Sequence, residues 1–330
     1  IYGARGANGV VLVSTKKGIK GKATLSYEFT YGIQNASKKI DLLGSADYQM
    51  LMNEMAENTP GREPYFTEPS KVDTDWQKVL RNKNAPIVNH KVSLSGGGEN
   101  STYYASFGYV KQEGIFAKGH SEYERYNFRL NYNNILIDTK QRNWLNKVSF
   151  NAIVNYAKEV KTGNDIGNSE AGGLISSMNM LPPTESVYQT DPATLERYES
   201  LYPNHVKSPD GRVYNIIDMN DVVNPLARMQ VEHNQRRIPQ TFGANFSLDA
   251  TLLPGLAFKT SYSSDWVFQS LKNVVPVYEL NSTTKNANSK VDDEKRESSN
   301  WQWENVLSYN KAFGQHNIGA LVGTTMSSYH

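Results

Sequence analysis

The chain has 330 residues, no cysteine and a formal net charge of +2, with acidic and basic residues dispersed along its length. The absence of cysteine excludes a disulfide scaffold and a thiolate metal site. Dispersed charge argues against a nucleic-acid-binding surface, which needs a concentrated basic face. The longest aliphatic run is Val10-Val11-Leu12-Val13, far short of the ~20 apolar residues of a spanning helix. The chain is therefore either soluble or crosses a membrane as strands, because only helices and closed barrels satisfy their backbone groups in lipid.

Glycines recur every three residues at the start of the chain. Residues 1–18 read IYGARGANGVVLVSTKKG, with Gly3, Gly6 and Gly9 before a short apolar strand predicted at 10–15. Glycines permit the positive-φ turns that let a chain reverse tightly. A phosphate-binding loop instead needs its glycines after a strand and before a helix N-terminus. The order found here argues against nucleotide binding.

Alternation of apolar and polar residues is the strongest signal in the rest of the chain. Residues 24–33 place polar or small residues on one face and apolar residues on the other, namely Leu25, Tyr27, Phe29, Tyr31 and Ile33. This pattern predicts a half-buried strand. Residues 126–132 and 241–252 alternate in the same way, and residues 148–156 do so apart from Ile153. Less regular strands are predicted at 89–95, 102–110, 256–268, 301–309 and 316–325, which makes nine in total. One clear helix is predicted at 46–57, and Pro60 stops its continuation.

The predicted connections alternate between long and short. The gaps 34–88, 157–240 and 269–300 are long, whereas 96–101, 253–255 and 310–315 are short, and 111–125 and 133–147 fit neither class. Antiparallel strands put alternate connections at opposite ends of a sheet, so one end is predicted to be tight and the other to carry large loops. Outer-membrane barrels have this asymmetry. A soluble β-sandwich, the competing interpretation of the alternation, gives no reason for it.

Aromatic residues fall near both ends of this layout. Tyr132 and Trp144 are expected near the short-turn end. The residues expected near the long-loop end are Tyr156, Trp266, Trp301 and Trp303. Trp and Tyr gather at both membrane–water boundaries because an apolar ring with a polar edge is best placed there. We therefore predict that these residues form an aromatic girdle.

The first eighteen residues resemble the end of the plug domain in SusC/RagA-type TonB-dependent transporters. The matching plug residues are Tyr2, Gly3, Arg5, Gly6, Asn8 and Gly9. Looser similarity continues through VNHKVSLSGGGENSTYYASFGYVKQEGIF and NWLNKVSFNAIVNY. The resemblance implies an all-β fold, with the last plug strand in residues 1–21. Residues 22–330 then hold about nine strands of an antiparallel transmembrane β-barrel of 22 strands. We expect the N-terminus to be cut, since the chain begins at Ile1, and expect most of the plug and the later strands to lie outside this sequence.

The resemblance also implies a function. It implies energised uptake of an oligosaccharide or a peptide across the outer membrane of a Gram-negative bacterium. A SusD-like lipoprotein would cap the outer face, and the TonB complex would act through the missing N-terminal region. No enzymatic activity, cofactor or nucleic-acid partner is implied. We also consider a pair between Arg5 and Glu28 on the inner barrel wall, with a solvated Arg5 as the alternative.

Four tyrosines in the long loop 157–240 are candidate sugar-stacking or lid-docking residues: Tyr188, Tyr198, Tyr202 and Tyr214. Ordinary loop packing is the alternative for each. The sequence shows no metal-ligand spacing among its histidines and no G-x-S-x-G motif. Asp292-Asp293-Glu294 lies beside basic residues, which predicts a solvated loop rather than a calcium site. The remaining alternatives are a soluble β-sandwich carbohydrate-binding module and a barrel enzyme or passive porin; the plug-like first residues argue against a porin.

Overall fold

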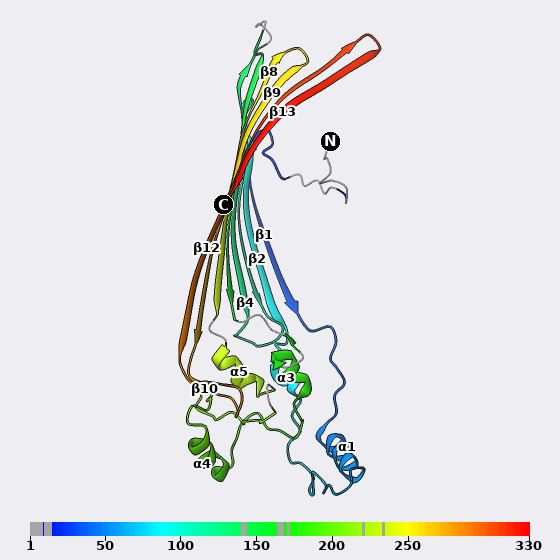
Figure 1. Cartoon of the computed structure of the whole chain (residues 1–330). Helices are drawn as coiled ribbons and strands as arrows, with labels where there is room; N and C mark the ends of the chain where they lie inside the picture. Colours follow the sequence, from blue (N-terminus) through cyan, green and yellow to red (C-terminus); the bar gives the residue numbers. More distant parts are fainter. Residues whose placement is uncertain are drawn as a thin grey trace.

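The strands predicted from alternation form one sheet. The computed structural model describes residues 9, 15–139, 144–163, 168–169, 172–219, 222–232 and 235–330. Within them, nine antiparallel strands pair in the order β1-β2-β3-β4-β5-β8-β9-β12-β13, so each long strand pairs with the next along the chain (Figure 1). Their bounds are β1 (Gly21–Gln34), β2 (Ala85–Gly97), β3 (Ser101–Glu113), β4 (Glu122–Asp138), β5 (Lys147–Thr162), β8 (Arg236–Leu253), β9 (Leu256–Val275), β12 (Lys290–Phe313) and β13 (His316–Tyr329). Each of the nine strands predicted between residues 24 and 325 lies inside one of these, which confirms their number and order. The strand predicted at 10–15 lies, apart from Thr15, outside the described residues.

The strands are longer than the sequence pattern predicted. β12 has 24 residues and β9 has 20, whereas ~9–11 residues suffice for a tilted strand to cross a membrane. The acidic stretch at 292–294, predicted to lie in a loop over 269–300, instead pairs in register with β9, and Asp293 lies opposite Lys272. The loop predicted over 269–300 is therefore too long, because β9 continues to Val275 and β12 begins at Lys290. Opposite charges on facing strands let the ladder continue through a polar stretch, which alternation of apolar residues cannot reveal.

The register places two classes of side chain on opposite faces of the sheet. One row across the strands consists of Tyr27, Val92, Phe107, Phe128, Tyr156, Phe242 and Trp266. The next row, whose side chains point the other way, consists of Glu28, Lys91, Gly108, Asn127, Ala157, Thr241 and Val267. We call the two sides the apolar face and the polar face.

The apolar face is uncovered. Phe107 is 50% exposed and Phe246 is 41% exposed. In the described part of the chain, the other sheets are two pairs of two-residue strands, so no second large sheet packs on this face. A soluble sandwich would bury these residues between two sheets, and this arrangement is not found.

The shortest turns lie at one end of the sheet and the longest loops at the other, and each end also carries one connection of eight residues (Figure 1). Residues 98–100, 139–146, 254–255 and 314–315 connect strands at one end, and residues 35–84, 114–121, 163–235 and 276–289 connect them at the other. The gaps 111–125 and 133–147 fitted neither class in the sequence. The strand order places the first at the loop end of the sheet and the second at the turn end. The turn at 254–255 requires Gly255, whose φ of 88° lies in the left-handed region that favours glycine.

The long loops pack together into what we call the loop unit. It contains α1 (Ser45–Glu57), α2 (Trp76–Leu80), α3 (Leu174–Met180), α4 (Pro192–Leu201), α5 (Pro225–Glu232) and the strand pairs β6 (Asn168–Ser169) with β7 (Gly172–Gly173) and β10 (Tyr278–Glu279) with β11 (Lys285–Asn286). One hydrophobic cluster joins the first three loops through Trp76, Ala117 and Met178. A second joins the third loop to the fourth through Val223 and Leu280. The helix predicted at 46–57 is confirmed by α1. Among the described residues, no helix has the length and apolar character needed to cross a membrane.

Candidate functional site

The polar face carries a connected set of amide, hydroxyl and carboxylate groups across three strands. Asn133 of β4 donates a hydrogen bond to Asn151 of β5, whose Nδ2 donates to Asp249 Oδ2 of β8 at 2.8 Å. Asn151 Nδ2 also lies 3.3 Å from Ser247 Oγ. These groups satisfy one another's hydrogen-bonding capacity between β4 and β5 and between β5 and β8. The wall that they form offers many hydrogen-bonding groups to a polar solute.

The segment just before β1 lies on this polar face. The carbonyl oxygen of Lys16 accepts a hydrogen bond from Asn131 Nδ2 of β4 at 3.3 Å. Of the predicted plug motif, Gly9 is exposed and has a left-handed φ of 100°. The rest of the motif lies outside the described residues: Tyr2, Gly3, Arg5, Gly6 and Asn8. The pair between Arg5 and Glu28 therefore stays a hypothesis. Glu28 lies on the polar face, as such a pair requires.

The four candidate tyrosines all lie in the loop unit but differ in burial. Tyr198 and Tyr214 are each 4% exposed, whereas Tyr188 and Tyr202 are half-buried. Tyr198 donates its hydroxyl to Asn215 Oδ1 at 3.0 Å. Burial therefore favours ordinary packing for Tyr198 and Tyr214, while Tyr188 and Tyr202 keep part of their surface exposed.

A stack of rings organises this part of the loop unit. The ring of Tyr188 lies 5.1 Å from that of Tyr214, and the guanidinium carbon of Arg212 lies 3.8 Å from the centre of the Tyr188 ring. The cation is attracted by the ring's negative face. Burial, together with the neighbouring Tyr188, raises the pKa of Tyr214 to about 12. Tyr214 therefore stays neutral at physiological pH.

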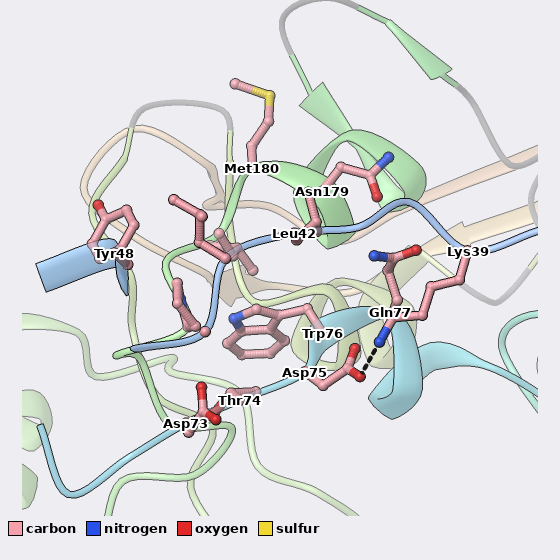
Figure 2. Close-up of a pocket in the computed structure, with 14 residues that line it drawn as sticks. Lys39, Leu42, Tyr48, Asp73, Thr74, Asp75, Trp76, Gln77, Asn179 and Met180 are labelled. Atoms are coloured by element: carbon pink, nitrogen blue, oxygen red, sulfur yellow. Dashed lines mark hydrogen bonds and ion pairs between the residues drawn. The ribbon is translucent and has the colours of Figure 1, made fainter. Parts of the chain in front are cut away.

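A pocket of ≈ 300 Å³ opens between the first and third long loops (Figure 2). Trp76 lines it, is only 2% exposed, and donates its indole N–H to the carbonyl oxygen of Pro182 at 3.0 Å. Its other walls include Leu42, Leu43, Tyr48, Asn179 and Met180. The sequence did not predict this pocket, because its walls lie about a hundred residues apart and neither carries a periodic pattern.

An ion pair lies at one side of the pocket. Lys39 Nζ is 2.6 Å from Asp75 Oδ2, the contact drawn as a dashed line in Figure 2. Asp75 also caps α2, since its Oδ1 accepts a hydrogen bond from the backbone N–H of Lys78 at 3.0 Å. Burial raises the pKa of Asp75, but the hydrogen bonds from Lys39 and from the Lys78 backbone outweigh it and hold the pKa below its ordinary value. An aspartate just before a short helix was the one local signal by which α2 could have been found.

Other polar groups around the pocket are paired within the protein. Asp73 Oδ1 accepts a hydrogen bond from the backbone N–H of Ser45 at 2.8 Å. Gln77 exchanges two hydrogen bonds with the backbone of Ile40, at 2.7 and 3.0 Å. These bonds fix the walls against one another. In the part of the chain that the structure describes, no group of three or more His, Asp or Glu side chains could hold a metal ion.

No family model matches the chain, but individual proteins do. The chain is 30% identical over 328 residues to TonB-dependent receptor P3 of Formosa agariphila and 24% identical over 340 residues to TonB-dependent receptor SusC of Bacteroides thetaiotaomicron. These matches cover 98% and 100% of this chain. The fold matches the RagAB peptide importer in the "open-open" state with a TM-score of 0.71 and 19% identity, over 100% of this chain and 37% of that one.

The chain belongs to the SusC/RagA-type TonB-dependent receptors.

This SusC/RagA-type chain spans 29% and 31% of the length of those two curated relatives. The resemblance noted in its first residues is thereby confirmed by matches along the whole chain. TonB-dependent receptors lie in the outer membrane of Gram-negative bacteria and are transport proteins rather than enzymes, so these two expectations are confirmed as well. The nine-stranded antiparallel sheet aligns with part of the RagA fold.

Most of the predicted girdle aromatics of this receptor share one face of the sheet, although Trp266, Trp301 and Trp303 lie near the middle of β9 and β12 rather than at the long-loop end where they were expected. Those on strands are all on the apolar face: Tyr132, Tyr156, Trp266, Trp301 and Trp303. Trp144 is in the turn 139–146 and is 65% exposed. Trp303 also donates its indole N–H to Thr260 Oγ1 at 2.9 Å. Their role as a girdle stays a prediction.

Proposed function

We propose that this chain forms the end of the plug and the first nine strands of the barrel in a TonB-driven importer of an oligosaccharide or a peptide. In this proposal residues 1–21 end the plug domain and residues 22–330 begin the barrel. The apolar face meets lipid, and the polar face lines the lumen that the plug closes. The turns face the periplasm, and the loop unit faces the outside of the cell.

The division of one sheet into an apolar and a polar face is the observation that carries this proposal. In transmembrane barrels an apolar band faces lipid while the interior is polar, and short turns and long loops lie at opposite ends. An open sheet edge cannot persist in hydrocarbon, so β1 and β13 must each pair with a further strand. Plugged outer-membrane transporters close with about 22 strands, and the nine found here supply less than half of such a wall.

The plug explains why uptake requires energy. A lumen as wide as that of a 22-strand barrel would leak unless something fills it. The segment before β1 already lies on the polar face, held by Asn131, which supports a plug on that side. We propose that the TonB complex pulls on the plug through a region N-terminal to this sequence and opens a path along the polar face.

The loop unit is proposed as the surface that a SusD-like lipoprotein covers. The RagAB structures that match this fold are described as a peptide importer in "open-open" and "closed-closed" states, with TM-scores of 0.71 and 0.69. A loop unit with its own hydrophobic clusters is ordered before a partner arrives, which lowers the entropic cost of binding. Tyr188 and Tyr202 are our proposed lid or ligand contacts, and Tyr198 and Tyr214 hold them in place from within.

Uptake by cells that carry the full-length receptor tests the proposal. Labelled glycans and peptides are offered to cells with and without a working TonB complex. We expect one of these two classes to accumulate, and only when both the receptor and the TonB complex are present. Uptake that persists without TonB contradicts an energised importer. A receptor that stays in the soluble fraction contradicts the barrel itself.

A further inference from the structure

The segment that leads into β1 is attached to the sheet at two points. The carbonyl oxygen of Lys16 accepts a hydrogen bond from Asn131 on β4. Gly18 lies against the backbone of Tyr103 on β3. β3 and β4 are not neighbours of β1, because β2 lies between. The segment therefore crosses the sheet before it enters β1.

Gly18 is required by close approach rather than by backbone conformation. Its φ is not among the left-handed values found at other glycines. A Cβ at this position would lie 2.6 Å from both the carbonyl carbon and the carbonyl oxygen of Tyr103, and closer still to its amide nitrogen. Real side chains do not approach a backbone so closely. Only glycine lets the two main chains touch here.

Burial of the polar face agrees with these contacts. Asn131 is 6% exposed, and Tyr104, its partner in register, is 7% exposed. Asn245 lies in the same register row as Asn131, two strands further along, and is only half-buried. Asn131 and Tyr104 are thus covered where the segment crosses the polar face, and Asn245 outside the crossing is less buried.

The first residues of β1 are paired irregularly. Gly21 pairs with Gly97, but the register shifts before the next pair, Thr24 with Ser95. Lys22 and Ala23 therefore fall outside the regular ladder. A force applied at Gly21 would act on the end of a strand and open its ladder one pair at a time, starting at this irregularity.

We propose that residues 16–18 form a latch on the polar face of β3 and β4, which stops a pull on the plug before it can peel β1 from β2. This inference rests on the proposed function, because it assumes that the plug is pulled. At the latch, the hydrogen bond to Asn131 and the contact of Gly18 with Tyr103 resist the pulling force together. Both must break before the force reaches Gly21.

Trypsin gives a direct test, because Lys16 and Lys17 are cleavage sites within the latch. The assay uses the full-length receptor in outer-membrane vesicles opened to the protease, with cleavage located by mass spectrometry. Asn131→Ala removes the donor and leaves the cleaved sequence unchanged, and Asn245→Ala is its matched control on the same face. Gly18→Ala adds the obstructing Cβ. Its control is Gly98→Ala, since a Cβ on Gly98 meets nothing within 4 Å.

We expect cleavage at Lys16 and Lys17 to accelerate about fivefold in Asn131→Ala, the effect of losing one buried hydrogen bond. Gly18→Ala should accelerate it as well, because its Cβ would lie 2.6 Å from the carbonyl group of Tyr103 and would force the segment away from β3. Both controls should cleave at the wild-type rate. Rates are divided by those of the unfolded proteins, which removes any preference of trypsin for alanine after Lys17. Equal rates in Asn131→Ala and the wild type would overturn the latch.

A second measurement tests whether the latch holds against the pull. Cells with either latch variant should become more sensitive to vancomycin, which is too large for intact outer membranes, and only when the TonB complex works. Sensitivity that is unchanged, or equal without TonB, overturns the role of the latch under force. If the wild type shows no TonB-dependent uptake, the proposed function fails, while the trypsin result still decides whether the attachment exists.

Discussion

Replacing Phe246 by arginine tests whether the apolar face meets lipid. Phe246 is 41% exposed on β8, between Ala152 and Tyr262 on the neighbouring strands. Leu253 is the last residue of β8. At ~3.4 Å per residue, Phe246 lies about 24 Å along the strand from Leu253. With a strand tilt of ~40°, this is about 18 Å above the turn.

The magnitude follows from that height. The apolar band of such a barrel is ~25 Å tall, so position 246 falls inside it. Arginine facing lipid costs ~2–4 kcal/mol at the midplane and ~0–1 kcal/mol near the boundaries. Position 246 lies about 5 Å from the midplane, so we expect a cost of about 2 kcal/mol, a change of roughly 30-fold in the folding equilibrium. Asn245→Arg adds the same charge on the polar face and should cost about 0.5 kcal/mol or less.

Both variants are made in the full-length receptor and refolded into phospholipid bilayers. Denaturant titration gives the free energy of unfolding, and the heat-dependent mobility of the folded barrel on a gel gives the folded fraction. We expect Phe246→Arg to lower the free energy of unfolding and the yield of folded barrel, and Asn245→Arg to leave both near the wild-type values. Equal destabilisation of the two variants, or tolerance of both, would refute the assignment of the faces.

Three further predictions concern the loop unit. Trp76→Ala removes a ring that is 2% exposed and should destabilise the unit by ~3–5 kcal/mol; proteolysis of the loops should accelerate while the sheet stays intact, and unchanged resistance would contradict this. Because the folded-state pKa of Asp75 is lowered, the stability that it contributes is present above its unfolded pKa and is lost as pH falls through the folded value. The protection of the α2 amides against hydrogen exchange, measured relative to the intrinsic exchange rate at each pH, should therefore fall in acid, and Lys39→Ala should weaken that dependence; an identical acid response would count against the ion pair. The raised pKa of Tyr214, about 12, means that stability is complete below its ordinary value of 10.0 and is lost as pH rises through 12. Tyr214→Phe should remove this alkaline loss in a circular-dichroism titration, and a persisting loss would assign it to another group.

The strands could be predicted because each carries its own signal. In β8, apolar residues occupy alternate positions from Phe242 to Leu252, which is enough to fix both the strand and the face that each residue takes. The alternation of long and short gaps then fixed which end carries the loops. Charged strand ends, such as the start of β12, lack that signal, and only pairing with β9 reveals them.

The loop unit could not be predicted because its stability is not local. The four unpredicted helices have 5 to 10 residues, too short to be stable alone. They are held by contacts between distant segments, as where the fully buried Asn281 donates to the carbonyl oxygen of Ile217 at 3.2 Å. The pocket beside Trp76 arises in the same way, and so no single stretch of sequence describes it.

The shared core of the loop unit has a consequence for biogenesis. Its first cluster needs Trp76, Ala117, Met178 and Met229 together, and these residues are delivered by loops that leave β1, β3 and β5. A slip of one residue in the pairing between these strands would invert a face of the sheet and displace a loop by ~3.4 Å. The core would then fail to close. Completion of the loop unit thus requires that the strands beneath it have paired in the correct order and alignment.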